Sequence, residues 1–254
     1  MKAEKPKRLR ADLLMVERGL APSREKAKAL IMAGLVKADG LPVEKAGQQL
    51  PEDVCIEVTQ RIPYVGWGGV KLSAAIEGFN LDVKGKVAAD FGASTGGFTH
   101  CLLLNGARLV YAVDVGYGQL DPSLRRDPRV VVMEKTNVRH LTGREFGEEI
   151  SLLTADLSFI SLTKVLPVIR EVLSPGGQAV LLVKPQFEVG KGQVGKGGIV
   201  KDPAMQDEAV ERVASCAQNL GFKVAGRMEA PRQREGKNRE FLLLLEKPWA
   251  GSGE

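Results

Sequence analysis

Apolar residues follow two different patterns along this chain, and the change of pattern divides it into two parts. In the first part, Arg10–Arg18 and Arg24–Ala33 have the three-to-four-residue apolar spacing of amphipathic helices, and Gly19 and Gly34 end these segments. Short strands are expected after the second helix, at Leu35–Lys37, Leu41–Val43 and Val54–Val58. Residues 1–60 are therefore predicted to form a small α+β domain.

From Lys86 onward, apolar runs of strand length alternate with helical segments. Seven strands are predicted, over Val87–Ala89, Arg108–Asp114, Arg129–Met133, Ile150–Ala155, Gln178–Val183, Phe222–Arg227 and Phe241–Leu245. Helices are predicted over Phe98–Leu104, near Arg144–Glu149, over Leu162–Leu173 and from Asp202 to about Leu220. This alternation is typical of an α/β fold with a mostly parallel sheet.

A segment rich in proline, glycine and aromatic residues, QRIPYVGWGG, separates the two patterns. Its composition favours a connector between domains. The predicted organisation is a domain over residues 1–60, a linker over residues 61–69 and a second domain over residues 70–254, whose first helix begins at Lys71.

The stretch KVAADFGASTGGF, residues 86–98, is expected to bind a ligand. Its strand ends at Asp90, and a glycine-containing turn opens a helix whose first N–H groups lack partners within the helix. The next strand ends in Asp114, 24 residues after Asp90, where nucleotide-binding units place the carboxylate that binds ribose. The spacing G-x-x-x-G-G differs from the dinucleotide pattern, which favours a nucleoside without a diphosphate, with S-adenosylmethionine as the first candidate.

Composition and charge narrow the functional classes. The chain has 254 residues, of which 44% are hydrophobic and 26% charged, as in soluble globular proteins. No apolar run reaches the roughly 20 residues that a membrane span needs. No secretory signal follows the basic N-terminus, so a cytoplasmic location is expected. The net charge of +5 and the pI near 9.1 favour a polyanionic partner.

The cysteines and histidines do not indicate a metal site. Cys55, Cys101 and Cys216 are widely spaced and are predicted to be reduced thiols of a cytosolic protein. His100 and His140 have no partner at a ligand spacing, so no metal is expected.

The first 40 residues hold ten Lys or Arg against five Asp or Glu. A solvated helix face would explain this excess. The segment LLMVERGLAPSREKAKALIMAGLVKADG, however, resembles the S4-like RNA-binding domain through the spacing S-R-x-x-A-x-x-x-I-x-x-G-x-V. The resemblance implies contacts to RNA phosphates, which make affinity depend on salt. The basic residues expected to make them are Arg8, Arg10, Arg24 and Lys28.

Charged residues end or follow several predicted parallel strands: Asp90, Asp114, Asp156 and Lys184. Ligands of open α/β sheets bind beyond the carboxyl ends of the strands, so these side chains are expected at one rim. Glu240 joins them if the last strand is antiparallel at the sheet edge. With Lys71 reaching over from its helix, two lysines and two carboxylates are expected to converge beside the ligand.

Five motifs follow the S4-like segment in order: DFGASTGGF, AVDVGYGQL, TADLSFIS, LLVKPQFEVGK and KNREF. In this combination the chain resembles the TlyA family of rRNA 2′-O-ribose methyltransferases, some of them labelled haemolysins. The resemblance implies an α/β, Rossmann-like class I methyltransferase of the FtsJ-like type with a mostly parallel seven-stranded sheet, preceded by a small α+β S4-like domain. It implies S-adenosylmethionine as cofactor and ribosomal RNA in ribosomal subunits as partner. No membrane partner is expected, and the protein is expected to be a monomer.

The resemblance also implies a catalytic tetrad of Lys71, Asp156, Lys184 and Glu240. The expected cofactor-binding residues are Asp90, Gly92, Ser94, Gly96, Gly97, Phe98, Asp114 and Asn137. Two of them have alternatives, since Asp90 could hold the glycine turn and Asn137 could be an ordinary loop residue. Relatives often have S-R-G-G before the first catalytic lysine, whereas this chain has Gly66-Trp67-Gly68-Gly69, which leaves open how the linker contacts RNA.

The expected chemistry is removal of a proton from a ribose 2′-hydroxyl, which is a weak nucleophile. Lys184 is the expected general base, with Lys71 as a second cation that favours its neutral form. Asp156 favours the charged form, so its expected role is to orient Lys184 and the ribose. Lys71 and Glu240 are expected to position the hydroxyl. General base catalysis contributes roughly 10²–10⁴-fold.

A second basic run lies before the last strand, and its members are Arg232, Arg234, Lys237 and Arg239. It is expected to bind the RNA backbone near the active site, although a solvated loop has the same composition. The Gly- and Lys-rich segment 188–201 is expected to be a functional lid.

Three other functions fit parts of the sequence. A non-catalytic ribosome-assembly factor would bind RNA with a vestigial nucleotide site, and substitution of Lys184 separates it from an enzyme. A pore-forming haemolysin conflicts with the lack of an apolar membrane segment. A base N-methyltransferase often has an N-P-P-Y-like segment after the fourth strand, where this chain has Asp156-Leu157-Ser158-Phe159.

Overall fold

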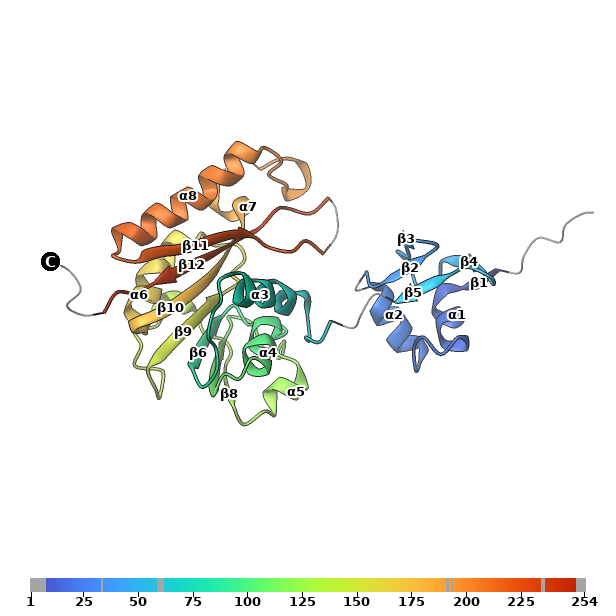
Figure 1. Ribbon diagram of the computed structural model, residues 1–254, viewed down its shortest axis with the longest axis horizontal. Helices are drawn as coiled ribbons and strands as arrows, with labels where there is room; N and C mark the ends of the chain where they lie inside the picture. The colour runs from blue at the N-terminus through green and yellow to red at the C-terminus, as the bar shows by residue number, and fades with distance from the viewer. Residues whose placement is uncertain are drawn as a thin grey trace, which may run out of the picture. The chain divides into compact units, whose positions relative to one another are not determined.

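The computed structural model describes residues 8–32, 34–58, 62–190, 192, 194–233 and 236–249. The chain divides into two compact units, Met1–Ile62 and Pro63–Glu254 (Figure 1). The division lies inside the predicted connector, close to the predicted end of the first domain at residue 60.

The first unit combines two helices with short antiparallel strand pairs. Its elements are β1 (Arg8–Arg10), α1 (Ala11–Glu17), α2 (Arg24–Met32), β2 (Val36–Ala38), β3 (Leu41–Pro42), β4 (Gln49–Pro51) and β5 (Ile56–Val58). β1 pairs with β4, and β2 pairs with β3 and β5. Leu14, Met15, Ala27 and Ile31 of the helices are buried in its core. Both predicted helices are confirmed, whereas β1 and β4 were missed because each has a single leucine among polar residues or proline, which gives no apolar run.

The second unit is built on one seven-stranded sheet. Its strands are β6 (Val87–Phe91), β7 (Leu109–Val113), β8 (Val130–Met133), β9 (Ile150–Ala155), β10 (Leu173–Val183), β11 (Lys223–Glu229) and β12 (Phe241–Glu246). Their spatial order is β11-β12-β10-β9-β6-β7-β8. The strands from β8 to β10 run parallel, and β12 is antiparallel to both of its neighbours. The predicted mostly parallel sheet of seven strands is confirmed.

The last strand, β12, lies inside the sheet rather than at the edge where the sequence placed it. Its residues Phe241–Leu245 are all buried, which suits a strand covered on both faces. The edge is formed by β11, in which exposed residues alternate with half-buried ones. The antiparallel direction of β12 is nevertheless as expected, so its first residues lie at the rim formed by the carboxyl ends of the parallel strands.

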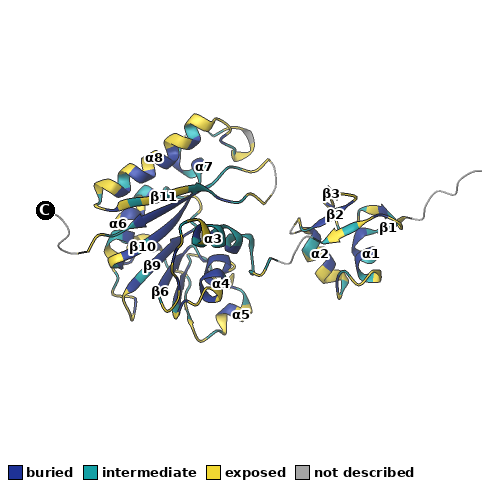
Figure 2. Cartoon of the chain, viewed as in Figure 1, coloured by how far each residue is buried: buried dark blue, intermediate teal, exposed yellow. Residues whose placement is uncertain are grey.

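Helices cover both faces of the sheet (Figure 1). They are α3 (Trp67–Gly78), α4 (Gly97–Leu104), α5 (Pro122–Arg125), α6 (Leu166–Val172), α7 (Pro185–Glu188) and α8 (Pro203–Asn219), with 3-10 helices η1 (Val138–His140), η2 (Leu162–Lys164) and η3 (Lys196–Gly198). Ala89 of β6 belongs to the core with α6 and α8, and Ala88 to the core with α3 and α4. The central strands are consequently buried on both faces (Figure 2).

One predicted helix does not form. The segment near Arg144–Glu149 consists of turns and bends. Gly143 has a φ of 84°, outside the helical region, and the Glu145 carboxylate accepts a hydrogen bond from the Thr142 N–H. This local bond closes a turn, which competes with helix formation.

Two predicted helix boundaries were wrong. α3 begins at Trp67 rather than at Lys71, so residues 67–69 of the predicted linker form its first turn. The helix predicted over Leu162–Leu173 is divided into η2 and α6. Pro167 lies in the first turn of α6, where proline favours a helix start.

Candidate active site

A sharp turn after β6 opens the site at the rim of the sheet. Gly92 in this turn has a φ of 84°, and a Cβ there would lie 2.5 Å from the carbonyl oxygen of Asp156. Only glycine allows the chain to pass so close to the end of β9. The turn leads into α4, whose first N–H groups point out of the helix.

A cavity of about 510 Å³ lies beside this turn, at the ends of β6, β7 and β9. Its lining residues are Gly92, Ser94, Asp114, Val115, Gln119, Thr136, Asn137, Val138, Arg139, Asp156, Leu157, Ser158, Phe159 and Ile160. Five of them have apolar side chains and eight have polar or charged ones, so the cavity offers both an apolar wall and several hydrogen-bonding groups. This larger cavity therefore has the composition expected of a nucleoside site.

Asp114 is fixed in this cavity by backbone hydrogen bonds. Its Oδ2 accepts from the Ser94 N–H at 2.8 Å and its Oδ1 from the Gly116 N–H at 2.7 Å. Each carboxylate oxygen has a second lone pair, so both can still accept a hydrogen bond from a ribose hydroxyl. Asn137 also lines the cavity, and its Oδ1 caps η1 by accepting from the Arg139 N–H at 3.1 Å.

A second cavity of about 190 Å³ adjoins the first. Gly97 and Phe98 of α4 line it, together with Trp67 at the start of α3 and Lys184 after β10. Both cavities share four wall residues, Gly92, Ser94, Asp156 and Ser158. A ligand with a large nucleoside part and a smaller polar part would fit this arrangement, with its junction near Asp156.

Lys184 and Asp156 form an ion pair at this junction. Their Nζ and Oδ1 atoms are 2.5 Å apart, and the side chains are 11% and 22% exposed. Lys184 also donates a hydrogen bond to Ser158 Oγ at 3.0 Å. The parallel strands β9 and β10 carry the two charges at adjacent ends, so the pair follows directly from the sheet topology.

Lys71 and Glu240 form a second ion pair. Lys71 Nζ lies 2.5 Å from Glu240 Oε2, and both side chains are less than one-fifth exposed. Phe241 pairs with Val183, so the antiparallel register places Glu240 beside Lys184. The structure thus brings the predicted tetrad together as two lysine–carboxylate pairs at one rim.

Asp90 lies beneath the site rather than in its wall. Its carboxylate is fully buried and accepts hydrogen bonds from Thr99 Oγ1 at 2.7 Å and Thr154 Oγ1 at 2.9 Å. Burial raises the pKa of Asp90 to about 6, although both hydrogen bonds oppose the shift. The structure favours the alternative in which Asp90 holds the glycine turn, because it ties β6 to α4 and β9.

Gly96 has a packing role as well. A Cβ at this position would lie 2.2 Å from the Leu124 side chain, and its φ is 96°. Gly96 is not among the described residues that line the two cavities, whereas Gly92, Ser94, Gly97 and Phe98 are.

The glycines before Lys71 let α3 approach α4 closely. A Cβ at Gly68 would lie 3.2 Å from the Phe98 ring, and one at Gly97 would lie 3.0 Å from the backbone of Gly69. Trp67 lines the smaller cavity and donates a hydrogen bond from Nε1 to the Pro231 carbonyl at 3.2 Å. The segment Gly66-Trp67-Gly68-Gly69 therefore holds the start of α3 against α4 and the smaller cavity.

Sequence reasoning missed several residues of the site. Phe159 lines the larger cavity, is 92% exposed and has a φ of 65°, which is unusual for a bulky residue. Its ring lies 5.2 Å from that of Phe187. Glu188 is buried and accepts hydrogen bonds from Ser161 Oγ and the Leu162 N–H, which ties the segment after β10 to that after β9. The motifs DLSFIS and KPQFE contain these residues, but nothing in either motif shows which side chains face the cavity.

The predicted RNA-binding residues of the first unit have different surroundings. Arg8 donates to the Gln49 carbonyl, and Lys28 is exposed on α2. Arg10 and Arg24 both pair with Asp12. All of these contacts are within the protein, so RNA binding by these four residues stays a prediction.

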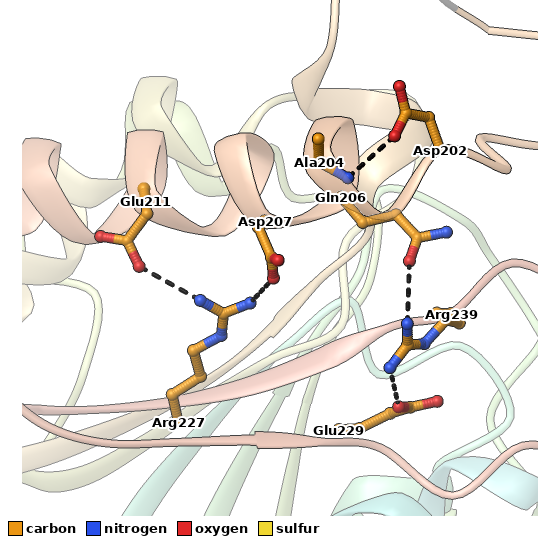
Figure 3. Close-up of polar contacts among 8 residues, drawn as sticks. All are labelled: Asp202, Ala204, Gln206, Asp207, Glu211, Arg227, Glu229 and Arg239. Carbon is orange, nitrogen blue, oxygen red and sulfur yellow. Dashed lines mark hydrogen bonds and ion pairs between the residues drawn. The ribbon is translucent and has the colours of Figure 1, made fainter.

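The second predicted basic cluster is tied to neighbouring carboxylates. Arg232 and Arg239 both pair with Glu229, and Arg239 also donates to Gln206 Oε1 of α8 at 3.4 Å (Figure 3). Arg227 on β11 joins the same face of α8 through Asp207 and Glu211. Lys237 is exposed, and Arg234 lies outside the described residues.

Within the described ranges, no helix is both long and apolar enough to cross a bilayer. The described part of the chain also has no cluster of three or more His, Cys, Asp or Glu side chains able to hold a metal ion.

Comparison with known proteins agrees with this geometry. A family model described as FtsJ-like methyltransferase matches residues 64–247, and one described as the S4 domain matches residues 9–54. The 16S/23S rRNA (cytidine-2′-O)-methyltransferase TlyA of Mycobacterium tuberculosis is 48% identical over 241 residues, which are 94% of this chain and 90% of that protein. YqxC of Bacillus subtilis, named as a candidate rRNA methyltransferase, is 46% identical over 250 residues, which are 98% of this chain and 88% of that protein.

A solved structure from Streptococcus thermophilus, described as a candidate hemolysin, matches with a TM-score of 0.74 and 42% identity. The match covers 96% of this chain and 91% of that chain. The chain therefore belongs to the TlyA family of FtsJ-like methyltransferases, with an S4 domain ahead of the methyltransferase domain.

Proposed function

We propose that this protein transfers a methyl group from S-adenosylmethionine to a ribose 2′-hydroxyl of ribosomal RNA, with cytidine as the target nucleoside. The observation that carries the proposal is the Lys184–Asp156 ion pair, because Asp156 lies in the wall shared by both cavities and Lys184 lines the smaller one. The relative from Mycobacterium tuberculosis is named for this reaction on 16S and 23S rRNA.

The two cavities fit S-adenosylmethionine, which supplies an electrophilic methyl group when bound. Asp114 would accept hydrogen bonds from the ribose hydroxyls of the cofactor. The apolar residues Val138, Leu157 and Ile160 of the larger cavity would surround the adenine, with Asn137 at its edge. The start of α4 at Gly97 would face the polar end of the ligand in the smaller cavity.

Lys184 is the proposed general base. In its neutral form it can accept the proton of the ribose 2′-hydroxyl. Asp156 and Ser158 both contact Lys184 Nζ, so the amine has a fixed position at the junction of the cavities. This fixed position supports proton transfer, because a base must lie within hydrogen-bond reach of the proton it removes.

Lys71 and Glu240 are proposed to position the substrate ribose. Their ion pair lies beside Lys184 in the sheet register, and Lys71 adds a second cation near the base. Asp156 and Glu240 balance these two positive charges.

The partner is proposed to be rRNA within ribosomal subunits, bound in the cytoplasm by a monomeric protein without a metal. The S4 domain and the net charge of +5 support a contact with RNA phosphates. A non-catalytic assembly factor would also bind RNA, but would not need the paired lysines. The solved structure from Streptococcus thermophilus is described as a candidate hemolysin, but the two lysine–carboxylate pairs and the adjoining cavities of this chain support methyl transfer.

The decisive experiment is transfer of labelled methyl from S-adenosylmethionine to purified ribosomal subunits, followed by nucleoside analysis. Wild type should produce 2′-O-methylcytidine, and Lys184→Ala should not, while both bind rRNA equally. Lys223→Ala removes a lysine of an exposed ion pair on β11 and should behave as wild type. Tight binding of wild type without any transfer would instead favour the assembly-factor hypothesis.

A further inference from the structure

A buried carboxylate joins two arginines on the surface of the first unit. Arg10 donates from Nε to Asp12 Oδ1 at 2.9 Å and from Nη2 to Asp12 Oδ2 at 3.1 Å. Arg24 donates from Nη2 to the same Oδ2 at 3.0 Å. Asp12 lies in the first turn of α1 and Arg24 begins α2, so this one carboxylate connects β1, α1 and α2.

Asp12 is an unusual residue to find at this position. Its neighbours Ala11, Leu14 and Met15 on α1 are core residues, and the Asp12 side chain itself is 0% exposed. A buried charge is costly unless it is paired. The two hydrogen bonds from Arg10, and then the one from Arg24, lower the pKa of Asp12 to about 2, so the carboxylate stays ionised at neutral pH.

The two guanidinium groups remain open to solvent above this carboxylate. The side chains of Arg10 and Arg24 are 41% and 45% exposed. A guanidinium has five N–H donors, and the bonds to Asp12 use two from Arg10 and one from Arg24. The trio keeps one net positive charge and several outward N–H groups in a fixed place.

We propose that the buried Asp12 is a positioning residue for RNA binding, which holds Arg10 and Arg24, the residues already expected to contact RNA phosphates, in one fixed arrangement. The inference rests on the proposed function, because it assumes that the first unit binds rRNA. Asp12 fixes both guanidiniums before RNA arrives, so less side-chain freedom is lost on binding. Planar guanidiniums with several aligned donors suit phosphate oxygens.

Two explanations of Asp12 predict opposite signs for one substitution. If Asp12 only stabilises the fold, Asp12→Asn removes a negative charge next to the RNA site, and the folded protein should bind RNA equally or more tightly. If Asp12 positions the arginines, the same change should weaken binding despite the added positive charge. An asparagine has one carbonyl oxygen and a donor group, so it cannot accept all three hydrogen bonds.

The experiment measures the affinity of the full chain for rRNA over a range of salt concentrations. Glu25→Gln is the matched control, because it removes one negative charge from an exposed position next to Arg24. We expect Asp12→Asn to bind about tenfold more weakly than wild type, and Glu25→Gln to bind equally or slightly more tightly. Arg24→Lys keeps the charge but loses the planar fork, so it should also bind more weakly.

Circular dichroism and thermal melting establish that each variant is folded at the assay temperature. Folded Asp12→Asn that binds as tightly as Glu25→Gln would overturn the proposal. If Asp12→Asn does not fold, Arg24→Lys decides, since affinity equal to that of wild type would exclude a preorganised fork. Failure of wild type to bind rRNA would contradict the proposed function itself, which the methyl-transfer assay tests separately.

Discussion

The two lysine–carboxylate pairs at the rim of the sheet have the same chemistry and the same Nζ–O distance of 2.5 Å, but different positions. Lys184 and Asp156 end adjacent parallel strands and line the cavity walls. Lys71 comes from α3 and Glu240 from the residue before β12, and neither is among the described residues that line the two cavities. Because of this difference in position, we propose that the Lys184–Asp156 pair, rather than the Lys71–Glu240 pair, acts directly on the reacting hydroxyl.

The supporting contacts of the pairs differ as well. Lys184 has a second partner in Ser158 Oγ, and its ammonium group lies 5.9 Å from the centre of the Phe187 ring. Both contacts come from segments that follow β9 and β10, so the strand ends hold Lys184 from two sides. Substitutions in the Lys184–Asp156 pair are therefore expected to cause a large loss of methyl-transfer activity, and substitutions in the Lys71–Glu240 pair a smaller loss.

The largest effect is expected at Lys184. Lys184→Ala removes the proposed base and should lower kcat by roughly 10²–10⁴-fold. Lys184→Arg is the sharper variant, because arginine keeps the charge but does not lose its proton. We expect the Lys184→Arg variant to be as inactive as Lys184→Ala in single-turnover methyl transfer. Substantial activity of Lys184→Arg would exclude the general-base role.

A smaller effect is expected at the second pair. Lys71→Ala or Glu240→Gln should lower kcat by about 10–100-fold, since each leaves a partly buried charge without its partner and misplaces the ribose. Lys223→Ala and Glu246→Gln break an exposed ion pair at the far end of β12 and serve as controls. If Lys71→Ala or Glu240→Gln lowered kcat as much as Lys184→Ala does, the proposed difference in role between the two ion pairs would be wrong.

Asp90 provides the contrast of a carboxylate without a lysine partner. Its folded pKa of about 6 exceeds the ordinary value of 3.8, so the folded state binds the proton more tightly than the unfolded state. The Asp90 contribution to the free energy of unfolding is thus least favourable above pH 6 and improves as the pH falls towards 4. Relative to Asp90→Asn, wild type should gain roughly 2–3 kcal/mol between pH 8 and pH 4.

Urea unfolding of both proteins at several pH values measures this difference. Asparagine has the same shape and no charge, so effects of all other titrating groups are shared. Parallel stability curves for wild type and Asp90→Asn would show that the Asp90 carboxyl titrates normally despite its burial.

The smallest effect is expected at Ser158. Ser158→Ala removes one hydrogen bond to Lys184 and should lower kcat about fivefold, as the loss of about 1 kcal/mol implies. Ser151→Ala is the control, because Ser151 lies near the start of β9 and its Oγ donates to the carbonyl of Val87 at the start of β6, away from the rim that holds Lys184. Equal activity of the two variants would mean that Ser158 does not hold the base.

Much of the fold was predictable because its signals are local. The apolar runs at Val87–Ala89 and Ile150–Ala155 are buried strands, and the glycine turn at Gly92 does open α4. Asp114 lies in the larger cavity as its distance from the turn predicted. The boundary at Trp67 was missed because the first turn of α3 packs against α4, which is distant in the sequence. The turn near Arg144 was missed because it depends on Gly143 and on one side-chain hydrogen bond between Glu145 and Thr142, which the apolar pattern does not reveal.

The sequence by itself determined the order of strands and helices and the residues at the strand ends, since hydrophobic periodicity and glycine position act within a few residues. Only the tertiary structure decided which of those residues meet. The inner place of β12 and the burial of Asp90 against Thr154 arise from segments far apart in the sequence, and Arg24 reaches Asp12 only because α2 packs against α1. Burial and charge pairing depend on this three-dimensional packing, and the local pattern of residues does not contain it.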